Sequence, residues 1–172
     1  MQNILVATDG SEHADQAIEL ASVLSTALNA KLHIVHVRDQ GTLSDDEIQL
    51  LSTEFSREVD KYINDNDMTN IPGSNSNYVK KHQEFAGIFH NIIGDYTMKS
   101  AVLLSKKNGV SDPDTHLRTG DAAENILSVA RMINTDLIVI GNRGRNKIES
   151  MLMGSVSTKV NQAAKAPVLI VK

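Results

Sequence analysis

The chain has 172 residues, 41% of them hydrophobic, which predicts one folded domain with a buried core and excludes wholesale disorder. Its 17 basic and 21 acidic residues give a net charge of −4, which argues against a dedicated nucleic-acid-binding protein but not against a small anionic ligand. The absence of cysteine excludes disulfides, a thiolate nucleophile and a cysteine-ligated metal site.

The first forty residues predict a strand, a helix and a second strand. A branched apolar run over Asn3–Thr8 ends in the turn residues Asp9-Gly10-Ser11, where Ser11 is placed to cap a helix. Apolar residues then recur at three- and four-residue steps up to Leu28, as in an amphipathic helix. Lys31–Val37 follows as the second strand.

The middle of the chain is longer than a single crossover helix requires. Apolar periodicity predicts helices over Ser44–Asn64 and Tyr78–Lys107, and composition predicts a loop over Asp65–Asn77. Gly87 and Gly94 interrupt the second helical pattern. We therefore expect a single domain over 1–172 with a helical insertion or extended crossover at about 41–110.

The last third alternates strands and helices most clearly. Asp121 and Glu124 have the spacing of a capping box at the start of one of its helices. The predicted elements are a strand at Thr115–Thr119, a helix from Gly120-Asp121, a strand at Asp136–Ile140, a loop at Gly141–Gly154, a helix at Ser155–Lys165 and a strand at Val168–Val171.

Five strands separated by helices predict an α/β fold, an open parallel sheet with helices on both faces. In such sheets ligands bind beyond the carboxyl ends of the strands, where the strand order reverses. Two loops with unusual chemistry follow strand ends, Thr8–Ser11 and Gly141–Ser157. Glycines permit close backbone approach to phosphate, a helix start favours an anion, and an Asp at a strand end accepts from ribose hydroxyls. Together these features predict a nucleoside phosphate site.

The loop spacing Gly141-x2-Gly144-x9-Gly154-Ser155 resembles the nucleotide-binding signature of universal stress proteins of the ATP-binding branch. Ile4 to Ser11 resembles that family's first strand and turn, and Gly120-Asp121 and Ala166 to Val171 resemble its other markers. The resemblance covers about residues 1–40 and 110–172.

This resemblance implies an adenine nucleotide alpha hydrolase-like sheet of order 3-2-1-4-5, ATP binding (with AMP or ADP as alternatives, and Mg²⁺ accompanying ATP) and a homodimer paired through the final strands. It implies that Asp9 contacts the ribose, with Ala7 and Thr8 beside it, and that Val37 lies at the adenine. It further implies that the nucleotide loop is lined by Gly141, Asn142, Arg143 and Gly144, and that the phosphates meet Gly154, Ser155, Val156 and Ser157.

Each of these residues also has a simpler interpretation. Asp9 is a common turn residue, and Ser155 could act as a helix N-cap alongside phosphate binding. The basic side chains of Arg143, Arg145 and Lys147 fit either phosphate neutralisation or a solvated loop.

The histidines do not predict a metal site. His33 and His36 are three residues apart on a strand and so face opposite ways. His82 and His90 are eight apart on a predicted helix, roughly 12 Å at the helical rise, and His13 and His116 have no ligand pattern nearby.

Nucleophile-elbow and Walker motifs are absent, so binding is better supported than turnover. The sequence thus predicts an ATP-binding regulatory module of the stress response with an unknown protein partner. The alternatives are a slow ATPase and an interaction protein with a vestigial nucleotide site. Without a signal peptide or an apolar run of the roughly 20 residues that a membrane span needs, we expect a cytoplasmic protein.

Overall fold

The computed structural model describes residues 1–38, 41, 75–144 and 153–172. The expected helix over 44–64, the loop over 65–74 and the basic residues Arg145 and Lys147 lie outside the described residues. The elements in chain order are β1 (Asn3–Thr8), α1 (Glu12–Leu28), β2 (Lys31–Arg38), α4 (Asn75–Lys107), β3 (Asp114–Thr119), α5 (Ala122–Met132), β4 (Leu137–Gly141), α6 (Ser155–Ala163) and β5 (Val168–Val171).

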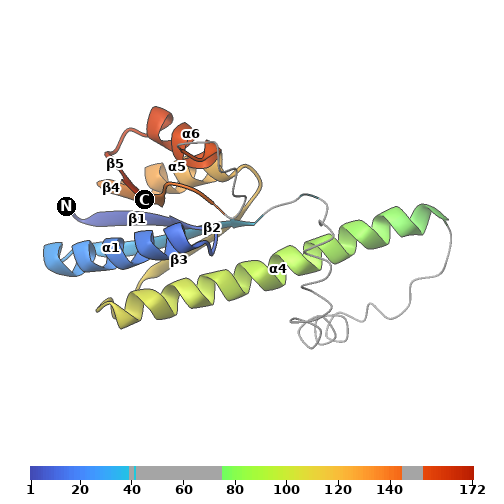
Figure 1. The fold of residues 1–172 in the computed structure, drawn as a ribbon, viewed down its shortest axis with the longest axis horizontal. Helices are drawn as coiled ribbons and strands as arrows, with labels where there is room; N and C mark the ends of the chain where they lie inside the picture. The colour runs from blue at the N-terminus through green and yellow to red at the C-terminus, as the bar shows by residue number, and fades with distance from the viewer. Residues whose placement is uncertain (39–40, 42–74, 145–152) are drawn as a thin grey trace. The chain divides into compact units, whose positions relative to one another are not determined.

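The strands form one sheet in the order β3-β2-β1-β4-β5, and every neighbouring pair is parallel (Figure 1). The predicted order and the predicted parallel pairing are both confirmed. β1 and β4 are neighbours, with Ile4 opposite Leu137 and Ala7 opposite Ile140. Because β1 also pairs with β2, the order reverses between β1 and β4, and this is the switch point at which an open sheet binds ligands.

Because side chains alternate between the two faces of a strand, the sheet carries an apolar layer on each face. Ile4 and Val6 of β1 face α1 and the C-terminal part of α4, where Met98 and Ala101 complete the layer. Leu5 of β1 faces the opposite way, toward α5 and α6 (Figure 1). Because both faces are covered, the central strands carry continuous apolar runs, as the sequence predicts for a doubly covered parallel sheet.

The helix ends follow the expected side-chain chemistry. Ser11 caps α1 by accepting from the backbone N–H of Ala14, and Asn29 ends that helix in the left-handed conformation with φ of 50°. Asp121 caps α5 by accepting from the backbone N–H of Glu124. Short polar side chains at these positions satisfy groups that a helix end leaves without intrahelical partners.

Two predicted helix boundaries differ from the structure by two or three residues, and the predicted bounds of β2, β3 and β4 differ by one residue. α4 begins at Asn75, three residues before the expected start, and continues through Gly87 and Gly94. α6 ends at Ala163, before the expected Lys165, because Ala164 is already extended at φ −69° and ψ 139°. Pro167 disfavours helical backbone in the residue before it, so the chain leaves the helix early and enters β5 extended.

The chain contains two compact units, residues 1–38 with 96–172, and residues 39–95. The first unit holds the whole sheet, and α4 contributes its last twelve residues to it. The interpretation of 1–172 as one domain with an insertion at about 41–110 stays a prediction. In the part of the chain that the structure describes, no helix is both long enough and apolar enough to span a membrane.

Candidate functional site

The turn after β1 presents the carboxylate of Asp9. Asp9 Oδ1 accepts from the backbone N–H of Ser11 at 3.0 Å, and Thr8 Oγ1 accepts from the backbone N–H of Gly10 at 3.2 Å. Gly10 has φ of +77°, and a Cβ there would lie 3.3 Å from Oγ1 of the buried Thr97. The turn is thus bonded within itself and backed by α4.

The loop after β4 begins against α1. A Cβ on Gly141 would lie 2.9 Å from both the carbonyl carbon and the carbonyl oxygen of His13, so only glycine fits without a backbone shift. The next residue, Asn142, is buried and donates its backbone N–H to the carbonyl of Val171 at 2.6 Å. The loop therefore leaves the sheet anchored to both α1 and β5.

The two turns converge. A Cβ on Gly144 would lie 2.5 Å from Asp9 Oδ2, which places the β4 loop directly over the carboxylate. The Ser11 hydroxyl, which accepts from Ala14, also reaches the carbonyl of Arg143 at 3.4 Å. Four of the residues picked out in the sequence, Asp9, Ser11, Arg143 and Gly144, are therefore neighbours at the switch point of the sheet.

The start of α6 is bonded to the same loop. The backbone N–H of Gly154 donates to the carbonyl of Asn142 at 2.8 Å, and a Cβ on Gly154 would lie 3.0 Å from that oxygen. Gly154 itself is the N-cap of α6 and supplies no side-chain bond, so the N-cap interpretation of Ser155 is wrong. Ser155 is exposed one position further on, in the first turn of the helix.

The Ser157 hydroxyl faces the protein. It is 2% exposed and lies 3.1 Å from the carbonyl of Asn142 and 3.0 Å from that of Gly154. A hydroxyl has one proton to donate, and here that proton is directed at the loop carbonyls. In this structure Ser157 therefore holds the loop in place, and an anion at this helix start would meet backbone N–H groups.

The starts of α1 and α6 differ in their suitability for an anion. α1 has the Ser11 cap and two acidic residues, Glu12 and Asp15, in its first turn. Burial raises the pKa of Asp15, and the nearby carboxylates of Glu19 and Asp9 raise it further. α6 has no acidic residue in its first turn and no side-chain cap, so its N–H groups and dipole favour an anion.

The remaining predicted residues lie around this centre. Ala7 is 6% exposed and packs in the core layer under α5 and α6, and the half-buried Val37 and Val156 pack against that layer. The Nε of Arg143 is buried and has no hydrogen-bond partner among the described residues. The structure therefore brings Arg143 to the site with part of its guanidinium unsatisfied.

Metal ligation has no support among the described residues, where no group of three or more histidine, aspartate or glutamate side chains could hold an ion. His33 and His36 face opposite ways as predicted, and the buried His36 ring lies with Nδ1 2.8 Å from the carbonyl of Thr8. The sequence analysis missed one contact, because His116 of β3 lies 3.1 Å from His33 of β2. The signal for it is the register of β2 and β3, which spacing within one strand does not reveal.

The fold and this convergence of loops define an α/β protein whose two loops meet at the switch point of the sheet, and comparison with known proteins names the family. The model of the universal stress protein family matches residues 1–172, and the chain belongs to that family.

Individual relatives agree with this assignment. The stress response protein NhaX of Bacillus subtilis (strain 168) is 30% identical over 169 residues, covering 98% of this chain and 96% of that protein. A crystal structure of a universal stress protein in complex with cAMP matches with a TM-score of 0.63 and 24% identity, covering 99% of this chain and 97% of that one. The universal stress protein from Archaeoglobus fulgidus in complex with dAMP matches with a TM-score of 0.60 and 20% identity, covering 100% and 98%.

Proposed function

We propose that the chain binds an adenine nucleotide where the turns after β1 and β4 converge. The observation that carries the proposal is the position of Gly144 directly over Asp9 Oδ2, which joins an acceptor for a ribose to a glycine loop. Asp9 accepts from the ribose hydroxyls, and Val37, near the carboxyl end of β2, contacts the adenine. The phosphates lie at the uncapped start of α6, with the Arg143 guanidinium as a further donor.

ATP is the proposed ligand, with AMP and ADP as alternatives and Mg²⁺ accompanying ATP. The complexes of family members with cAMP and dAMP support the adenylate part of this proposal. A loop glycine and a helix start without acidic side chains support a charged phosphate group on the ligand.

We further propose that the bound nucleotide regulates the protein in the cytoplasm as part of a stress response. The active form is a homodimer paired through β5, and its protein partner has yet to be found. A nucleotide changes the state of such a protein only through different affinities for its two conformations. Nucleotide-dependent partner capture is therefore the expected output.

Titration calorimetry with ATP, AMP and cAMP tests the nucleotide proposal, together with analysis of the nucleotide that the protein carries through purification. We expect saturable binding of at least one adenine nucleotide. Asp9→Ala should weaken that binding about tenfold or more, because it removes a charged acceptor worth about 1.5–3 kcal/mol. A folded protein that binds none of the three at millimolar concentration contradicts the proposal.

Gly144→Ala separates a site effect from a folding effect. Its new Cβ meets only the end of the Asp9 side chain, which can swing away, so stability should change little while the ribose acceptor is displaced. Gly87→Ala is the matched control, because a Cβ at Gly87 meets no atom within 4 Å. We expect weaker binding in the first variant and wild-type binding in the second. Equal affinities in the two variants would argue against a ligand over Asp9.

A further inference from the structure

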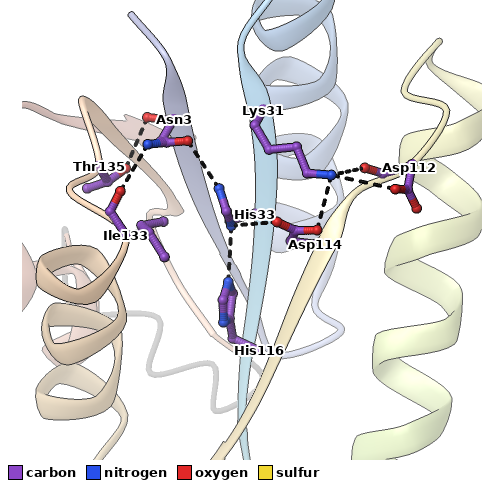
Figure 2. Close-up of polar contacts among 8 residues, drawn as sticks. All are labelled: Asn3, Lys31, His33, Asp112, Asp114, His116, Ile133 and Thr135. Carbon is purple, nitrogen blue, oxygen red and sulfur yellow. Dashed lines mark hydrogen bonds and ion pairs between the residues drawn. The ribbon is translucent and has the colours of Figure 1, made fainter.

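A second polar cluster lies at the other end of the strands. Asn3, Lys31 and Asp114, drawn in Figure 2, stand at or near the starts of β1, β2 and β3. The turns of the proposed nucleotide site follow the ends of β1 and β4. Two histidines, His33 and His116, meet within this cluster on the face of the sheet that α5 covers (Figure 2).

The hydrogen bonds fix where the protons are. Asn3 Nδ2 donates to the carbonyl of Ile133 at 2.9 Å, so Asn3 Oδ1 is the atom that faces His33 Nε2 at 3.3 Å. An amide oxygen only accepts, and His33 therefore carries its proton on Nε2. In the neutral ring Nδ1 is then bare, and it accepts from the Nε2–H of His116 at 3.1 Å. Figure 2 shows this chain of contacts from Ile133 to His116.

The backbone of Asn3 is held firmly on both sides. Its backbone N–H donates to Asp136 Oδ2 at 3.0 Å, and its carbonyl accepts from the hydroxyl of Thr135 at 3.2 Å. The bond from Asn3 Nδ2 to the Ile133 carbonyl, at the join between β1 and the end of α5, sets the amide orientation and with it the proton on His33 Nε2.

The charged residues around His33 do little to stabilise a second proton on its ring. Asp114 Oδ2 lies 3.6 Å from His33 Nδ1, but Asp114 Oδ1 is also paired with Lys31 Nζ at 3.1 Å, and Lys31 reaches Asp112 at 3.6 Å. Burial lowers the pKa of His33, with Asp114 opposing the shift and Lys31 adding to it. Burial likewise lowers the pKa of His116, His33 and Arg118 add to that shift, and Asp114 opposes it.

We propose that His33 and His116 form an acid-sensitive lock that holds the edge strand β3 to the sheet. Neutral His116 can carry its proton on Nδ1 and accept at Nε2, so the bond between the strands survives one added proton; once both rings are protonated, N–H faces N–H and the bond breaks. Among the described strands β3 pairs only with β2, so loss of this bond loosens β3 before any other strand. The lock lies away from the proposed nucleotide site and does not depend on it.

The direction of the pH effect follows from the lowered pKa values. In the unfolded chain each histidine has its ordinary pKa of 6.5, so it binds a proton more readily there than in the folded protein. The contribution of the pair is therefore complete above that value and is lost as pH falls from it toward the lower folded-state pKa values.

Urea unfolding of the full chain between about pH 7.5 and pH 5 tests the lock, with histidine titration by NMR in the same range. We expect the urea midpoint of the wild type to fall over this interval. The double variant His33→Gln with His116→Gln keeps amide donors and acceptors but cannot take up protons, so its midpoint should fall by less. His13→Gln is the control, and its urea midpoint should fall as far as that of the wild type. Equal falls in wild type and double variant would overturn the proposal.

If the double variant fails to fold, hydrogen exchange of the wild type tests the proposal instead. We expect both histidines to titrate below pH 6.5 and the protection factors of the β3 amides, Asp114–Thr119, to drop at least several-fold more than those of β1 at about pH 5. Histidines that titrate at their ordinary pKa while β3 keeps its protection would refute the lock.

Discussion

At the scale of single residues, two glycines of one loop serve different purposes. A side chain on Gly141 would strike the backbone of His13 and Ala14 on α1, which is fixed by helical hydrogen bonds. A side chain on Gly144 would strike only the carboxylate of Asp9, which can rotate. Gly141 is therefore needed to pack α1 on the sheet, whereas Gly144 lets the loop after β4 approach the carboxylate of Asp9.

Gly141→Ala should lower the free energy of unfolding by about 1–3 kcal/mol, the usual range when a methyl group is forced into a packed site. The added Cβ lies 2.9 Å from the His13 carbonyl and 3.0 Å from the backbone nitrogen of Ala14, so β4 and α1 must move apart. Urea unfolding followed by circular dichroism measures the change.

Gly87→Ala is again the comparison, since it adds the same methyl group in open space within α4. That variant should be neutral or slightly more stable, because alanine favours helix over glycine by up to about 1 kcal/mol. If Gly141→Ala unfolds at the wild-type urea concentration, the close approach of α1 to β4 is incorrect.

The sequence predicts which residues lie side by side where backbone spacing alone sets their place. Asp9 and Gly144 follow the ends of two strands, and a parallel sheet brings such ends together whatever the intervening chain does. Ser155 and His116 could not be placed in this way. The N-cap position depends on the backbone angles of Gly154, and the histidine contact depends on the register between β2 and β3.

At the scale of elements, the start of α1 links helix stability to the site. Ser11 Oγ accepts from the N–H of Ala14 at 3.3 Å, which satisfies a free group of the first turn, and donates to the carbonyl of Arg143 at 3.4 Å. One hydroxyl thus caps a helix and joins the turn after β1 to the loop after β4.

Ser11→Ala should cost about 1 kcal/mol of unfolding free energy, the typical loss on removing an N-cap. Ser11→Asn should recover most of it, because the Asn side chain is also a preferred cap and carries donors as well as an acceptor. Urea unfolding of the three proteins provides the comparison. A variant with alanine that is as stable as the wild type would show that the cap contributes nothing.

Two helix starts were predicted from their capping side chains, whereas the start of α4 and the end of α6 were not predicted correctly. Ser11 and Asp121 predict the starts of α1 and α5, because a short polar side chain before an apolar periodic run has a defined partner, the third N–H of the helix. The end of α6 had no such signal. Ala164 is a good helix former, and it is extended because the chain must turn toward β5 before Pro167.

At the scale of the whole molecule, the sheet of the described residues has three central strands, each paired on both sides, and two edge strands. β1, β2 and β4 each pair on both sides, while β3 and β5 pair on one side only. The fold class and strand order follow from alternation and family resemblance, because they depend on long-range patterns that survive sequence divergence. Whether an edge is paired with a second copy depends on surface contacts that a single chain does not contain.

The open edge of β5 is the proposed dimer interface, and its hydrogen bonds indicate which residue to change. The carbonyl of Pro167 accepts from Ile138 of β4 and that of Val171 from Asn142, the residue after β4, so by the alternation of a parallel ladder the backbone groups of Val168 and Ile170 point away from β4. Ile170→Pro removes an outward N–H without removing a bond to β4, and proline is tolerated on an edge strand for this reason. We expect the wild type to elute as a dimer in light-scattering chromatography and Ile170→Pro to elute as a monomer with wild-type circular dichroism. A wild type that stays monomeric at about 100 μM, roughly a hundred times the micromolar range of modest interfaces, would exclude pairing through β5.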